Sequence, residues 1–255
     1  MPSPTDFNLS PYYDDFNESK KFHRILFRPS FAVQARELTQ SQSILQNQVE
    51  KVSDHLFEKG AMVIPGEIGY NLFYYSVKLT SFTDSAAVGV TLNDFIGLRL
   101  TGGTSGVTAK VIGVDATDGT DPNTLYVKYE NSGTNNTSEK FTAGETISVA
   151  TTLQGTSTTV SAVVNTCHTG AAAYVGAGVY YINGFHVDVA EQTIILDKYT
   201  NTPSYRVGLT VTESFVTPND DTSLNDNATG TSNVNAPGAH RFKIDLTLAK
   251  KTLTA

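Results

Sequence analysis

Residues 179–189 read VYYINGFHVDV, and this stretch indicates how the chain folds. Two runs rich in β-branched and aromatic residues flank Asn183-Gly184, the dipeptide that favours a tight two-residue β-hairpin turn. The hairpin ends a longer stretch, residues 146–187, that lacks Asp, Glu, Lys and Arg. A segment exposed to solvent rarely runs for so many residues without a charged side chain. We therefore expect a β-rich chain in which part of this stretch is buried in a core or against another subunit.

Short β-type runs recur on both sides of the hairpin. Between residues 76 and 166 they alternate with Gly-containing turns, which is typical of a small antiparallel barrel or sandwich. We interpret 76–166 as a module inserted into a main β domain of residues 61–75 and 167–255. At the end of the chain, apolar and polar residues alternate over 242–248 (FKIDLTL), which predicts a half-buried final strand.

A helical segment precedes the β region. Residues 31–59 contain neither Gly nor Pro, and Gly60 follows where a helix would end, so we expect a long helix over 31–60. Its apolar residues recur at alternating spacings of four and three, which is the heptad pattern of a coiled coil. We name this row the seam: Phe31, Ala35, Leu38, Gln42, Leu45, Val49, Val52 and Leu56.

Two interpretations of the seam remain open. It can mediate self-association, with Gln42 as the polar residue that sets register and oligomer state. Alternatively, the helix packs on its own sheet, with Ile44 and Phe57 widening the apolar stripe.

The first 30 residues predict an extended arm, rich in Pro, Asp, Asn and Tyr. Its Asp14, Asp15, Glu18 and His23 could form a metal or acid–base cluster. The simpler interpretation is that they cap turns or pair with basic residues of the same arm, which are Lys20, Lys21, Arg24 and Arg28.

Composition excludes several classes of protein. The 255 residues carry a formal net charge of −7, which disfavours nonspecific binding to nucleic acid or anionic lipid. A single Cys offers neither a disulfide nor a Cys-based zinc site. No apolar run is long enough to span a bilayer, and the N-terminus lacks a signal-peptide pattern, so we expect no membrane insertion and no secretion.

We find no convincing motif for chemistry. Residues 102–110 (GGTSGVTAK) lack the Gly-Lys-Ser/Thr ending of a phosphate loop and predict a β-turn. Asp115, Asp118 and Asp121 could bind calcium, but their spacing fits no EF-hand loop and favours a solvated turn. Cys167 and His168 are neighbours on a predicted strand, so they point to opposite faces. We therefore expect no enzyme, no catalytic residue, no cofactor and no metal.

Several motifs resemble those of a known group of proteins. They are FRP at 27–29, QARELTQSQ at 34–42, PG at 65–66, VYYINGF at 179–185 and DNATGTSNVNAPGAHR at 226–241. Together they resemble virion proteins of tailed bacteriophages, a family with an uncharacterised domain found in baseplates and tail fibres of contractile-tailed phages, cyanophages among them. The resemblance covers about the first 75 and the last 80 residues. It implies a structural protein without catalytic residues.

Together these observations predict an α+β, mainly β, structural subunit of a phage tail or baseplate, with one long N-terminal helix, a possible coiled coil, and antiparallel sandwich or barrel modules. We expect a homo-oligomer, a trimer by preference, made in the host cytoplasm and carried in the virion. Its arm and helix would dock a fibre or a neighbouring baseplate protein. Arg28 and Arg36 belong either to that interface or to ion pairs within one subunit, with Glu37 and loop acids. The alternatives are a module that binds host-surface glycan and a tailspike-like hydrolase.

Overall fold

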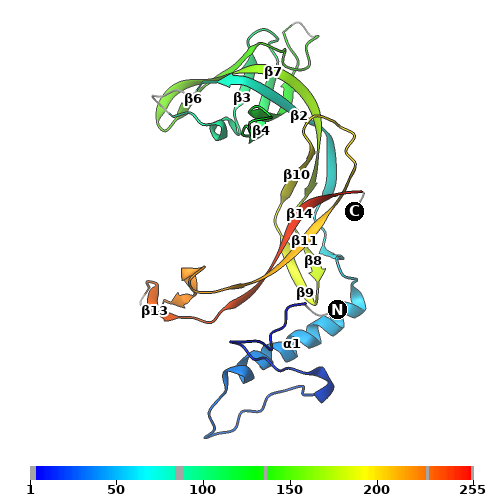
Figure 1. Ribbon diagram of the computed structural model, residues 1–255, viewed down its shortest axis with the longest axis vertical. Coiled ribbons are helices and arrows are strands. Elements are labelled where there is room, and N and C mark those ends of the chain that lie inside the picture. The colour runs from blue at the N-terminus through cyan, green and yellow to red at the C-terminus, as the bar shows by residue number, and fades with distance from the viewer. Residues whose placement is uncertain (1–3, 84–88, 135–136, 228–229, 254–255) are drawn as a thin grey trace. The chain divides into compact units, whose positions relative to one another are not determined.

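The computed structural model (Figure 1) describes residues 4–83, 89–134, 137–227 and 230–253 of the chain. Over these residues the fold is mainly β, with one α-helix, α1 (Ala35–Leu56), and antiparallel strand pairs. The predicted fold class is confirmed. The chain divides into two compact units, described separately below. We call them the helical unit (Met1–Ile68, Val175–Gln192 and Gly208–Ala249) and the barrel unit (Gly69–Tyr174, Thr193–Val207 and Lys250–Ala255).

Seven strands build the sheet of the barrel unit. They are β2 (Ile68–Phe82), β3 (Arg99–Gly102), β4 (Thr108–Asp115), β5 (Thr124–Asn131), β6 (Thr146–Leu153), β7 (Thr156–Val175) and β10 (Gln192–Asp197). Their order is β10-β7-β2-β5-β4-β3-β6, and β6 also pairs with β7. This last, antiparallel pairing closes strands β2 to β7 into a six-stranded barrel, to which β10 is added beside β7.

The core of the barrel is filled by side chains that point inward from strands in which buried and exposed residues alternate. Along β3, Leu100 is fully buried, whereas its neighbours Arg99 and Thr101 are exposed. The 3-10 helix η2 (Leu92–Phe95) adds the fully buried ring of Phe95. The largest buried side chains of this core are Val77, Phe95, Leu100, Val107, Val111, Leu125, Val127, Ile147, Val160 and Val164. Apolar residues therefore point inward here, as the hydrophobic effect demands.

A buried carboxylate fixes the turn between β3 and β4. Glu145 is 4% exposed and accepts hydrogen bonds from the backbone N–H groups of Thr104, Ser105 and Thr142 at 3.0, 2.9 and 2.6 Å, and from the Ser105 hydroxyl at 2.9 Å. Burial alone raises the pKa of Glu145, but these hydrogen bonds outweigh it and hold the pKa below its ordinary value. Of the predicted turn over residues 102–110, residues 103–107 connect β3 to β4, whereas residues 108–110 belong to β4.

The helical unit contains three small sheets. The first has the order β1-β8-β9, with β1 at Met62–Ile64, β8 at Gly178–Ile182 and β9 at Phe185–Val189. The second pairs β11 (Tyr205–Val216) with β14 (Arg241–Thr252), and the third pairs β12 (Asn225–Asp226) with β13 (Asn233–Pro237). Two 3-10 turns, η1 (Glu18–Lys20) and η3 (Thr222–Leu224), complete the unit.

The predicted hairpin is confirmed. Strands β8 and β9 pair antiparallel, Ile182 opposite Phe185, across Asn183 and Gly184, whose φ angles are +49° and +89°. Positive φ at both turn positions matches the twist of the two strands, and Asn-Gly tolerates it. Part of the charge-free stretch is buried, as expected, since Tyr181 is only 1% exposed.

A second core forms around this hairpin. Buried side chains of β8 and β9 pack with the inward row of β11 and β14. Its members include Tyr180, Ile182, Val187, Val189, Leu209, Val211, Ile244, Leu246 and Leu248. The alternation predicted for the final strand is therefore present, with Leu246 buried between the exposed Thr247 and the half-buried Asp245.

The compact units differ in their limits from the predicted domains. The predicted insert, residues 76–166, lies inside the barrel unit, which also takes in residues 69–75 and 167–174. The predicted limits fall within the continuous strands β2 and β7, whereas the nearest unit boundaries along the chain come after Ile68 and after Tyr174.

Candidate assembly surface

The helix α1 is shorter than the predicted segment 31–60. It begins at Ala35, where the side chain of Glu37 accepts a hydrogen bond from the backbone N–H of Gln34 at 2.8 Å, and it ends at Leu56. A helix N-terminus leaves N–H groups unpaired, and a Glu placed in this way pairs one of them. Phe31 of the α1 seam therefore precedes the helix rather than belonging to it.

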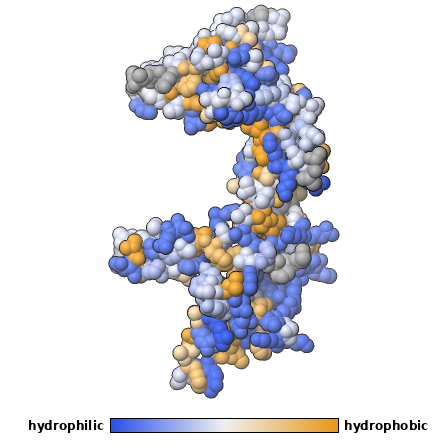
Figure 2. Space-filling view, viewed as in Figure 1, coloured by the Kyte–Doolittle hydropathy of each residue, from blue (hydrophilic) through white to orange (hydrophobic). Residues whose placement is uncertain are grey.

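The remaining seam residues lie on one face of α1. Most of that face is open to solvent, whereas Gln42 also lines the cavity described below. Leu45 is 67% exposed, Val52 62% and Leu56 66%. The others, Ala35, Leu38, Gln42 and Val49, are exposed too, as is Phe31. Orange surface in the lower part of Figure 2, around α1 and the segment before it, shows apolar side chains in contact with solvent. The seam does not pack on the strands of its own chain.

A polar face of α1 packs on the chain instead. Gln46 donates from Nε2 to the carbonyl of Gly184 at 2.6 Å, and Ser53, which is 5% exposed, lies 3.0 Å from Nε2 of His186. Phe57, just past the helix, contacts the ring of His186 at 6.1 Å between centroids. These partners belong to the β8–β9 hairpin. Polar side chains thus bind α1 to its own unit, together with Phe57 and with Ile44, which is 6% exposed.

The N-terminal arm runs beside α1 (Figure 1) and holds its other flank. The buried Asp14 accepts a hydrogen bond from the Ser43 hydroxyl. Asp15 lies 3.5 Å from Arg36, and Glu18 pairs with Lys51. The acidic residues of the arm do form ion pairs, but the predicted partners within the arm were wrong, because the basic partners come from α1.

The two predicted interface arginines have partners within the chain. Arg36 pairs with Asp15 rather than with Glu37, whose carboxylate caps the helix. The Arg28 guanidinium lies 4.2 Å from the centre of the Phe31 ring, which is a cation–π contact. Both arginines lie in exposed segments, Arg36 on α1 and Arg28 before it.

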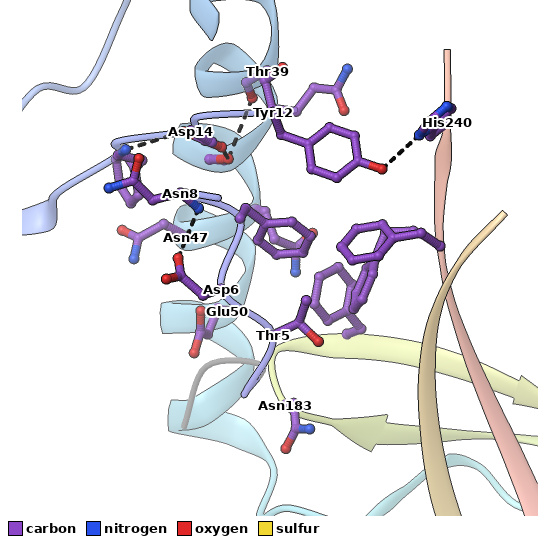
Figure 3. A pocket seen from close by; sticks show the side chains of 18 of the residues that line it. Thr5, Asp6, Asn8, Tyr12, Asp14, Thr39, Asn47, Glu50, Asn183 and His240 are labelled. Atoms are coloured by element: carbon purple, nitrogen blue, oxygen red, sulfur yellow. Dashed lines mark hydrogen bonds between the residues drawn. The ribbon is translucent and has the colours of Figure 1, made fainter. Parts of the chain in front are cut away.

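The other side of the arm contacts β11 and β14 through aromatic rings. Phe7 lies edge-on to Phe242 with 5.0 Å between centroids, and Tyr12 lies 5.1 Å from Phe215. The Tyr12 hydroxyl is hydrogen-bonded to Nδ1 of His240 at 2.7 Å, as Figure 3 shows. The arm therefore connects α1 to the strand pair and fixes the helix in the orientation that leaves its seam exposed.

A cavity of about 1150 Å³ lies between the arm, α1 and the strand pair (Figure 3). Aromatic rings from β11 and β14 face amide side chains of α1, such as Gln42 and Asn47, across it. At one end Glu50 is partly buried, and burial together with the nearby Asp54 raises its pKa.

The acidic loop of the barrel unit is neutralised by lysines. Lys198 Nζ lies 2.5 Å from Asp115, and Lys78 Nζ lies 3.2 Å from Asp121. Asp118 accepts from the backbone N–H groups of Thr120 and Asp121, which closes a turn. The turn interpretation agrees with these contacts. Within the described residues, no group of three or more His, Cys, Asp or Glu side chains could hold a metal ion.

The interpretation of packing within the chain named Ile44 and Phe57, and Ile44 is 6% exposed while Phe57 contacts His186. Sequence reasoning missed the polar residues that also pack α1 on its chain. Thr39, Ser43, Gln46 and Ser53 recur at the same alternating spacing as the seam, on a neighbouring face. Because such residues are equally typical of a solvated face, the spacing alone would not have identified their partners.

Comparison with known families gives a match over more than half of the chain. Residues 10–71 and 135–255 match the family described as Domain of unknown function (DUF4815). The chain belongs to this family. The match includes the arm from residue 10, α1, the β8–β9 hairpin and the β11–β14 pair, whereas the unmatched residues 72–134 lie within the barrel unit. Comparisons with curated proteins and with solved structures gave no match.

One further property concerns membranes. Among the helices that the structure describes, none is long and apolar enough to cross a bilayer.

Proposed function

We propose that this chain is a non-enzymatic structural subunit that self-associates through the α1 seam. The observation that carries the proposal is the exposure of the apolar seam of α1. A helix on the surface of a monomeric protein buries its apolar stripe and exposes its polar face. Here Gln46 and Ser53 bind the chain's own hairpin, while Leu45 and Val52 are exposed.

A second copy of the chain is the occupant that this surface fits. The seam has the four-and-three spacing by which identical helices interlock their side chains. The positions that flank it toward a neighbouring helix carry no Asp, Glu, Lys or Arg, so identical helices would not repel one another: Thr39, Ser41, Gln46, Gln48, Ser53 and His55.

The apolar area is large enough to matter energetically. Fully burying a Leu or Val side chain contributes about 1.5–3 kcal/mol, so a side chain that is half to two-thirds exposed gains on the order of 1 kcal/mol. Five such side chains line α1: Leu38, Leu45, Val49, Val52 and Leu56. Their sum from each helix opposes the entropy that association costs.

We further propose that the assembly is part of a phage tail or baseplate, as a trimer that connects a fibre or a neighbouring baseplate protein. The motifs that resemble phage virion proteins support this placement, and two of them, at 34–42 and 179–185, lie in α1 and in the hairpin that holds it. An antibody against the chain should then label tails in electron micrographs of particles from its source. Label on heads, or on no particle, would contradict the placement.

Sedimentation of the purified full chain tests self-association. The native chain should sediment as an oligomer, and the pair Leu45→Asp with Val52→Asp should make it a monomer, because charge cannot be buried unpaired in the seam. The matched control is Thr210→Asp with Thr212→Asp, which adds the same charge at exposed positions of β11 and should remain oligomeric. A native monomer, or an oligomer that the seam variant leaves intact, would overturn the proposal.

A further inference from the structure

We infer that the α1 helices of neighbouring copies lie parallel and in register, with their Gln42 side chains in one layer. This inference rests on the proposed self-association and specifies its geometry. In heptad notation, Ala35, Gln42, Val49 and Leu56 take position a, and Leu38, Leu45 and Val52 take position d. The e flank is then Thr39, Gln46 and Ser53, and the g flank is Ser41, Gln48 and His55.

The first argument comes from which flank is already covered. The β8–β9 hairpin of the same chain lies against the e flank, through Gln46 to Gly184 and Ser53 to His186. On the g flank, Gln48 and His55 are exposed. In antiparallel pairs the e flanks face each other, which would bring two hairpins to the same place. In parallel pairs an e flank faces a g flank, so each hairpin lies beside a bare flank.

The second argument comes from the polar member of the seam. In parallel, in-register helices, the Gln42 side chains meet and their amides can donate to and accept from one another. With antiparallel helices of full overlap, Gln42 would face Leu45 or Val52. The amide would then be buried without a partner, which is costly. A single polar residue at position a is known to select register in this way.

Both arguments are independent of the number of copies. A closed three-fold assembly around α1 requires parallel helices in any case, because its symmetry axis relates the helices by rotation alone. A two-fold assembly permits parallel or antiparallel helices, and in that case the covered e flank and Gln42 favour the parallel arrangement.

Disulfide trapping in the full chain tests the inference. Leu38→Cys and Val52→Cys are made singly, each with Cys167→Ser, which removes the native thiol. The two positions are 14 residues apart, about 21 Å along a helix, whereas the Cα atoms of a disulfide lie about 4–7 Å apart. In parallel, in-register helices each variant should form a disulfide-linked dimer with itself on oxidation.

Antiparallel helices would give the opposite pattern. Neither variant would cross-link alone. Because position a faces position d in antiparallel helices, a linked dimer would form only when Leu38→Cys is produced together with Val49→Cys or Leu56→Cys, each with Cys167→Ser. That pattern in a sample that sediments as an oligomer would overturn the parallel arrangement and leave self-association standing. A sample that sediments as a monomer would instead refute the proposed self-association. Thr212→Cys with Cys167→Ser, at an exposed position of β11, measures random collision and should not cross-link.

Discussion

Leu100 and Leu45 are both leucines in regular secondary structure, but Leu100 is buried in its own chain and Leu45 is exposed to solvent. Leu100 on β3 is fully buried in the barrel unit, whereas Leu45 on α1 is 67% exposed. The barrel buries its apolar residues within one chain and needs no partner to do so. The helix packs on its chain through Gln46, Ser53 and Ile44 and leaves its apolar seam exposed, so an apolar row in the sequence does not by itself show which face is buried within the chain.

The largest expected effect contrasts these two leucines. Leu100→Ala should lower the unfolding free energy of the barrel unit by about 2–5 kcal/mol, because it leaves a cavity in a closed core. Leu45→Ala should leave that value unchanged and shift dissociation of the oligomer to higher protein concentration. Denaturant unfolding at two protein concentrations measures both. An equal, concentration-independent loss at Leu45 would show that the helix packs within its own chain.

The next effect concerns Glu145. Its folded pKa lies below the unfolded value, so its stabilising contribution is present above the unfolded pKa and is lost as the pH falls through the folded pKa. Glu145→Gln should cost about 2–3 kcal/mol at neutral pH, since hydrogen bonds to the charged carboxylate are lost. The variant should also lose less stability than the native chain on acidification below about pH 4.5. Unfolding followed from pH 7 to pH 3 checks this, and parallel curves would contradict it.

A smaller effect is expected at the arm. Asp14→Asn removes the buried carboxylate that accepts from Ser43, and it should destabilise the arm against α1 by about 1–2 kcal/mol. Limited proteolysis should then cleave the arm faster than in the native chain. Asp6→Asn is the control, because Asp6 is exposed and accepts only from the backbone N–H of Asn8 among the described contacts. Equal cleavage rates for the two variants would contradict the role given to Asp14.

The smallest effect is expected at the barrel surface. Arg99 and Glu130 lie 2.8 Å apart, but the Arg99 side chain is 66% exposed. Exposed ion pairs contribute little because water and salt screen them. Arg99→Ala should therefore change the unfolding free energy by less than about 1 kcal/mol. A larger loss would show that the outer face of the barrel contributes more to stability than its exposure implies.

Much of the fold could be predicted from the sequence because its signals are local. Asn183-Gly184 fixed the hairpin, and the alternation at the end of the chain fixed β14. The helix was predicted to begin at residue 31, four residues before its observed start at Ala35. Glu37 caps the helix at Gln34, so the apolar residues before that cap lie outside the helix. Local sequence signals could not predict the limits of the compact units, because long strands such as β7 continue through those limits.

The contacts of the candidate surface depend on distant partners. Nothing near Asp15 or Glu18 in the sequence indicated that their cations would be Arg36 and Lys51 on α1. The seam itself was visible as a period of apolar residues. Whether it faced its own sheet or solvent was decided by Gln46 and Ser53, whose binding to the hairpin occupies another face of the helix.

The most direct test measures whether the seam is buried in solution. In the Cys167→Ser chain, Leu45→Cys and the exposed reference Thr212→Cys are each reacted with a thiol reagent under native conditions. Burial of the seam between copies predicts that the thiol at position 45 reacts much more slowly than the reference, and that dilution below the assembly concentration abolishes the difference. Equal rates at a concentration where the chain is oligomeric would contradict the central claim, because the copies would then meet through another surface.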